Sequence, residues 1–104
     1  MARAMFSSGS LARALVQHAG ASHVQLRLAG GYCSLWSEQH TNGLPYEGQW
    51  QGRTRLALPV LREALASVED QPITLDLHWE GPGKLYALEQ LPGGLGSVEI
   101  LLPA

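Results

Sequence analysis

The chain has 104 residues, of which 45% are apolar and 15% charged, and its formal net charge is −2. This length suits one domain with one core, and the apolar content excludes a disordered tail. Cys33 is the only cysteine, which excludes an intramolecular disulfide and a cysteine-based zinc site and favours a reducing compartment. The apolar runs are far shorter than the ~20 residues of a membrane-spanning helix. We therefore expect a single cytoplasmic domain over residues 1–104.

The charges are unevenly distributed along the chain. Residues 1–37 carry three arginines and no acid, whereas residues 38–104 carry four basic and nine acidic groups. A basic, serine-containing N-terminal segment is similar to an organelle transit peptide. We favour a structural role for it, because the same segment takes part in an internal repeat.

The first half of the chain predicts a strand, a helix and a hairpin. A short strand is expected over residues 3–6, and a helix follows it, with the serines at positions 7, 8 and 10 as N-cap candidates. The apolar stripe of this helix consists of Leu11, Ala14, Leu15 and His18. Residues 23–28 alternate between apolar and polar, which predicts a half-buried strand. Gly30-Gly31 should turn the chain into a second strand that ends at Glu38-Gln39.

The second half repeats this order after an irregular segment. Residues 40–52, rich in Gly, Pro and Asn, are expected to connect the halves. A strand is predicted over residues 54–58 and a helix after it, with Pro59 in its first turn. The stripe of this helix consists of Leu61, Ala64, Leu65 and Val68. An alternating strand over residues 72–79, a strand that ends at Glu89-Gln90 and a last strand over residues 97–102 complete the pattern.

The two helical segments align at an offset of fifty residues, which matches two leucines and the alanine between them in each copy. The chain is therefore predicted to be an α+β domain of two βαββ-type repeats, over about residues 2–39 and 53–102, with two helices packed on antiparallel sheet. We expect the matching leucines to be buried in one core. They are Leu11, Leu15, Leu61 and Leu65.

The sequence offers no arrangement of residues that favours catalysis, a metal or another cofactor. Its four histidines lack metal-ligand spacing, and His18 is interpreted as a partly buried core residue. Cys33 lies in an expected strand and is interpreted as a small buried hydrophobe, while Glu69-Asp70 is interpreted as a solvated helix end. Tyr46 and Trp50 are candidates for a partner-binding surface. Alternatively, they fold back as a lid over the core.

The order of the elements resembles one domain of a DNA polymerase sliding clamp, most closely the bacterial beta clamp. The resemblance rests on the segments 53–70 and 73–77, with a strand, a small-Pro step, an amphipathic helix and an alternating strand. It also rests on the closing run Val98-Glu99-Ile100-Leu101-Leu102-Pro103. It covers almost the whole chain at the level of pattern.

The resemblance implies a non-catalytic protein of replication or repair that acts as a processivity or scaffold factor. Clamp domains turn their helices toward double-stranded DNA and join through strand edges, so the resemblance implies that Arg13, Gln17 and Arg62 face DNA and that the chain forms a homo-oligomer. The alternative is a protein-interaction module that reuses the fold without binding DNA. It is favoured by acidic residues on and after the second helix, Glu63 and Glu69-Asp70.

Overall fold

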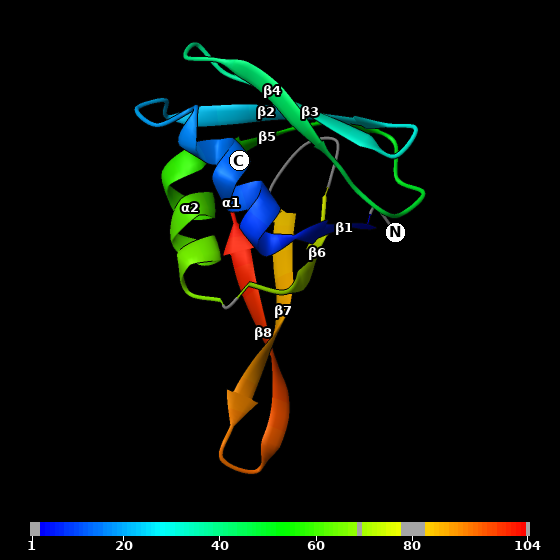
Figure 1. Cartoon of the computed structure of the whole chain (residues 1–104), viewed down its shortest axis with the longest axis vertical. Helices are drawn as coiled ribbons and strands as arrows, with labels where there is room; N and C mark the ends of the chain where they lie inside the picture. Colours follow the sequence, from blue (N-terminus) through cyan, green and yellow to red (C-terminus); the bar gives the residue numbers. More distant parts are fainter. Residues whose placement is uncertain (1–2, 69, 78–82, 104) are drawn as a thin grey trace.

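Two helices and eight strands are present among residues 3–68, 70–77 and 83–103, the part of the chain that the computed structural model describes (Figure 1). In chain order they are β1 (Arg3–Ser7), α1 (Ser8–Val16), β2 (His23–Ala29), β3 (Tyr32–Trp36), β4 (Thr41–Pro45), β5 (Gly52–Ala57), α2 (Leu58–Ala66), β6 (Pro72–Asp76), β7 (Gly83–Leu91) and β8 (Gly94–Leu102). The expected end of the strand at residues 78–79 lies outside the described residues. In the described part, no helix is long and apolar enough to span a membrane.

The α+β prediction is confirmed, and the last strand, predicted over residues 97–102, is present as β8. The first half contains one strand more than predicted. Residues 41–45, assigned from the sequence to the connector, form β4, which pairs antiparallel with β3. The sequence did not predict this strand because it contains Gly43 and Pro45, and both residue types are unfavourable in strand interiors. Both are tolerated here since β4 is an edge strand. The first hairpin is also shorter than expected, since β3 ends at Trp36 rather than at Glu38-Gln39.

The two halves exchange their first strands. β1 pairs with β6 of the second half, and β5 pairs with β2 of the first half, both antiparallel. The result is one sheet in the order β1-β6-β7-β8, called sheet A here, and one in the order β4-β3-β2-β5, called sheet B. Each four-stranded sheet is therefore complete only with a strand from the other half of the chain.

One core lies between the two sheets and the helix pair. β1 and β6 of sheet A and β2 and β5 of sheet B alternate between buried and more exposed positions, so each sheet has one apolar face and one open face. The helices lie side by side, with α1 against β1 and β4 and α2 against β2, β5 and β8 (Figure 1). The four leucines of the helix stripes are buried as predicted, with exposed fractions of 0 to 5%: Leu11, Leu15, Leu61 and Leu65.

The start of α1 is fixed by residues from both halves. The Ser7 hydroxyl accepts a hydrogen bond from the Ser10 amide, so the N-cap is one of the three serines that the sequence offered. Asp70 accepts a bond of 3.1 Å from the Gly9 amide, so this exposed carboxylate, predicted to lie at a solvated helix end, also caps a helix 61 residues away. A negative charge is favourable at a helix N-terminus. Glu69 lies outside the described residues. α2 has Pro59 in its first turn and no side-chain cap.

Gln71 extends the pairing of β6 beyond its first residue. Pro72 has no amide hydrogen to donate to the ladder. Instead, the side-chain amide of Gln71 donates to the Leu88 carbonyl at 2.8 Å and accepts from the Leu88 amide at 3.0 Å. This side chain therefore imitates the peptide group that a neighbouring strand would present.

Replacing Leu65 by Ala should lower the free energy of unfolding by about 2–5 kcal/mol, because the truncation leaves a cavity under α2. Urea denaturation of both proteins measures this difference. Val16→Ala is the matched control, since Val16 is 58% exposed on α1, and it should change stability by less than about 0.5 kcal/mol. An equal, small effect of both substitutions would contradict the assigned core face.

Cys33 should react with a thiol reagent only when the protein unfolds. It is fully buried in β3, and burial raises the pKa of its thiol from 9.0 to about 12. The thiolate, which is the reactive form, is therefore scarce and inaccessible at pH 8. Labelling followed by absorbance should be slow in buffer and fast in denaturant. Fast labelling of the native protein would contradict the burial of β3.

Candidate functional site

The three residues that the sequence assigned to DNA lie on the surface of the helix pair. Arg13 and Arg62 are exposed in the middle of α1 and α2, and Gln17 is the exposed C-cap residue of α1. Arg13 donates a hydrogen bond of 3.3 Å to the Ser10 hydroxyl. The structure therefore places all three on the helical side of the domain. Glu63 is exposed on the same helix as Arg62, so the charge of this surface is small.

Tyr46 and Trp50 fold back against the core. Tyr46 is only 6% exposed, and its ring lies 6.0 Å from the ring of Phe6. Its hydroxyl donates a 2.8 Å hydrogen bond to the Trp50 carbonyl, while the Trp50 side chain is half-buried against the core. This arrangement agrees with the lid interpretation and leaves little of the Tyr46 ring for direct contact with a partner.

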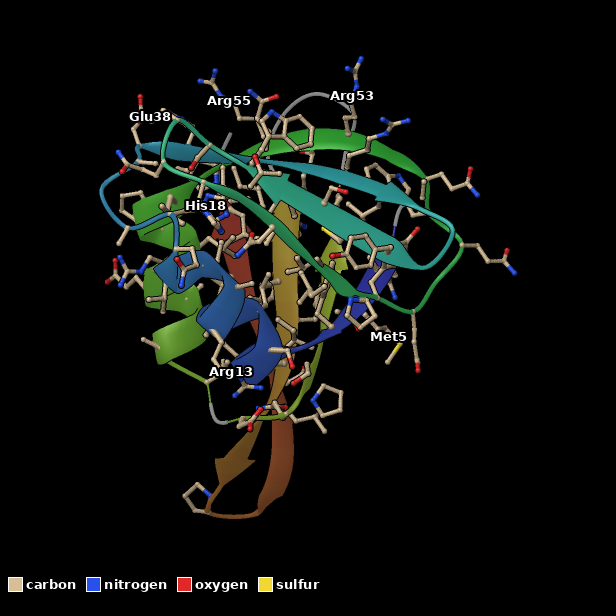
Figure 2. All side chains as sticks on the ribbon, turned by 45° about the horizontal axis from the view of Figure 1, so that its top comes forward. Met5, Arg13, His18, Glu38, Arg53 and Arg55 are labelled. Carbon is tan, nitrogen blue, oxygen red and sulfur yellow. The ribbon has the colours of Figure 1, made fainter. Side chains whose placement is uncertain are left out.

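A groove of about 350 Å³ opens beside Tyr46. It runs between β1, the start of α1 and the segment after β4, with Met5 at its margin (Figure 2). Met5 is 44% exposed although it is a large apolar side chain. The remaining lining residues are Phe6, Ser7, Ser10, Pro45, Glu47 and Pro72. The groove is mainly apolar and can receive an apolar side chain of another molecule.

His18 is a buried structural residue, as Figure 2 illustrates. The Asn42 amide donates to the Ala14 carbonyl at 2.8 Å, so its oxygen faces His18 Nε2 as an acceptor, also at 2.8 Å. Nε2 therefore donates, and Nδ1 lies 2.6 Å from the Ser37 hydroxyl. These bonds tie the end of α1 to the β3–β4 hairpin. Within the described residues, no three His, Cys, Asp or Glu side chains lie together as metal ligands would.

The four sheet edges are not equally open to another strand. The outer edge of β1 is bridged at Met5, which exchanges backbone hydrogen bonds of 2.7 and 3.0 Å with Glu47. At the end of β5, the Ala57 amide donates one bond to the Pro103 carbonyl. β4 and β8 each pair with one strand in their sheets. Within the described residues, β4 and β8 have no such contact along their outer edges, so we take these two strands as the edges to which a further strand can be added.

The exchange of first strands brings three arginines together in sheet B. Because β5 joins the strands of the first half, sheet B carries Arg27, Arg53 and Arg55 and no acidic residue in its strands. Sheet A carries both signs on its outer face, including a 3.0 Å ion pair between Lys84 and Glu99. This pair raises the pKa of Lys84, mainly through its hydrogen bond. The sequence showed a basic segment at residues 1–37, but not that β5 extends the positive surface.

The fold matches solved structures of a bacterial beta clamp. A complex of the Helicobacter pylori beta clamp with carprofen superposes with a TM-score of 0.73 at 15% identity, over 97% of this chain and 29% of the clamp chain. The same clamp bound to a DNA ligase peptide gives a TM-score of 0.70 at 14% identity, over 98% of this chain and 31% of the clamp chain.

The similarity is one of structure rather than of sequence. No family model matches the chain, and no curated protein matches its sequence significantly. The chain spans about 30% of the length of the clamp chains it matches, as in the complex with 5-chloroisatin, where the share is 30%. In each superposition, nearly all of this chain is matched. The chain therefore has the fold of one domain of a bacterial beta clamp.

Proposed function

We propose that this chain is a non-catalytic, sliding clamp-like protein of DNA replication or repair, which assembles through its strand edges and encloses duplex DNA as a processivity or scaffold factor. The observation that carries the proposal is a clamp-domain fold with two open strand edges, one in each sheet. Such a clamp would act in the cytoplasm by enclosing DNA, without a bound cofactor and without catalysing a reaction.

The assembly step joins β8 of one copy to β4 of the next. β8 is the edge of sheet A and β4 the edge of sheet B, so repeated addition is head-to-tail and generates a ring if the rotation closes. Leu101 adds an apolar contact, since it is 58% exposed on β8.

The helix pair then lines the opening of the ring. One copy contributes few charges, Arg13 and Arg62 together with the polar Gln17. In an assembly, the same weak contacts recur in every copy and add up along the duplex. Arginine contacts to phosphate position a protein without reading bases. The complex should therefore slide and should not select a sequence.

The second candidate is a protein-interaction module that uses the same fold without DNA. It is favoured by the low charge of the helix surface, because phosphate neutralisation dominates nucleic-acid affinity. In both functions we propose that replication or repair partners dock beside Tyr46 and Trp50. A partner would insert an apolar side chain into the groove at Met5, whose lining is mostly apolar.

Self-association should depend on the edge of β8. Light scattering of the wild type at tens of micromolar, where interfaces of about −6 kcal/mol begin to populate, should give a mass above the 11.2 kDa of one chain. Leu101→Glu should shift the mass toward one chain, because it adds charge at the proposed contact. Val16→Glu should not, although Val16 and Leu101 are both 58% exposed. A strictly monomeric wild type would rule out the assembly.

Retention on DNA should depend on the helix arginines. Replacing Arg13 and Arg62 together by Glu should abolish retention on circular duplex DNA at low salt, while the circular dichroism spectrum and the mass of the assembly stay unchanged. Both side chains are exposed and lie away from the two edges. If the wild type is not retained even at low salt, where phosphate contacts are strongest, the interaction module replaces the clamp function.

A further inference from the structure

The outer face of sheet B combines arginines with aromatic side chains. Arg27, Tyr32, Trp36 and Arg55 belong to β2, β3 and β5, and all four alternate with residues buried on the other face of the sheet. We call this surface the basic face. Figure 2 shows Arg55 and the neighbouring Arg53 extending from sheet B on the side opposite the helices. Among the described elements, none lies over this surface.

The register brings these side chains next to one another. Gln25 lies opposite Trp36 on β3 and opposite Arg55 on β5, so the three form a row across the sheet. Arg27, two residues farther along β2, lies opposite Arg53. Residues two apart on a strand are separated by about 7 Å. Positive charge and an aromatic ring thus alternate within a short distance.

Two hollows mark the ends of the basic face. One has a volume of about 400 Å³ and is lined by Gln25, Trp36, Glu38 and Arg55 with their neighbours. The other has about 410 Å³ and is lined by Arg27 and Arg53 with residues 28–29 and 51–52. In the described part of the chain, the guanidinium groups of Arg27 and Arg55 have neither an ion-pair nor a hydrogen-bond partner. Glu38 is the acidic residue that lines a hollow of this face.

Tyr32 and Trp36, at opposite ends of the basic face, differ in how much of their rings is exposed. Tyr32 is 52% exposed, and its ring lies against β4, where a Cβ on Gly43 would come within 2.6 Å of it. Glycine at position 43 therefore lets the ring lie close to the backbone of β4, and the exposed part of the ring faces solvent. Trp36 is half-buried beside Arg55. Both rings offer surface on which a planar group can stack.

We infer that the basic face binds a single-stranded nucleic acid, with phosphates on Arg27 and Arg55 and unpaired bases against Trp36 and Tyr32. Arginines interleaved with aromatic rings on an open sheet are the combination that holds single strands. A duplex keeps its bases stacked internally and leaves the rings unused. An acidic peptide would use the arginines but has no bases to stack. This site is separate from the helix surface proposed to face duplex DNA.

Fluorescence anisotropy with labelled oligo(dT) and oligo(rU) tests this inference, and comparison of the two strands shows whether the surface distinguishes DNA from RNA. The wild type should bind at low salt, and the double variant Arg27→Gln, Arg55→Gln should bind at least tenfold more weakly. Its slope of log K against log salt should be smaller by about 1.4, since each phosphate contact on a single strand contributes about 0.7. Arg3→Gln with Lys84→Gln removes the same amount of positive charge from sheet A; this matched control should leave binding unchanged.

Two further variants separate stacking from charge. Trp36→Ala should weaken binding by roughly 5- to 150-fold, the equivalent of one lost base stack, whereas Trp36→Phe should retain most of it. Thermal unfolding of both variants verifies that they are folded. Glu38→Gln should tighten binding, because it removes a negative charge beside Arg55.

Three results would overturn the inference. The first is a wild type that does not bind either strand at low salt. The second is equal binding by the wild type and the Arg27, Arg55 double variant. The third is competition by poly-glutamate as effective as that by unlabelled oligo(dT), which would show a general polyanion surface.

Discussion

The exchange of first strands between the two halves is the constraint on which the rest of the structure depends. β1 completes sheet A only by pairing with β6, and β5 completes sheet B only by pairing with β2. The pairs join residues far apart in the chain, so neither half has a complete sheet of its own. The Asp70 carboxylate at the start of α1 and the Gln71 backbone, which bonds to Ser8, add contacts of the same long range. Folding is therefore expected to be cooperative over both halves.

The same exchange determines which surfaces are open and what charge they carry. It leaves β4 and β8 at the free edges of two different sheets, which is the geometry that head-to-tail addition requires. It also carries Arg53 and Arg55 to the sheet that already holds Arg27. The strongest concentration of positive charge in the described strands thus lies on the outer face of sheet B, rather than on the helices. Edge assembly and the basic face can consequently operate at the same time.

The sequence predicted the structural features that depend on local residue patterns. The helix stripes, the alternating strands, the serine N-cap and the Gly30-Gly31 turn follow from spacing and from residue type, and the two glycines indeed have φ values of 59° and 83°. The sequence did not predict β4, because Gly43 and Pro45 are poor strand residues that are stabilised here only by pairing with β3. A strand of this kind depends on tertiary context.

The candidate site was predictable only in part for a related reason. Exposure of Arg13 and Arg62 follows from their positions off the apolar stripes. The burial of Tyr46 depends on Phe6, forty residues earlier in the chain, and could not be read from the loop that contains it. The basic face likewise arises from pairing between β2 and β5. Local patterns say nothing about which strands become neighbours.

The most direct test of edge assembly is a disulfide between copies. Thr41 on β4 and Leu101 on β8 are both exposed, and the buried Cys33 can be replaced by Ser to remove the native thiol. Oxidation of a Cys33→Ser chain with Thr41→Cys and Leu101→Cys should give a ladder of covalent oligomers on a denaturing gel. The same chain with Val16→Cys in place of Leu101→Cys should not. Equal cross-linking by both chains, or none by either, would contradict assembly of β8 on β4.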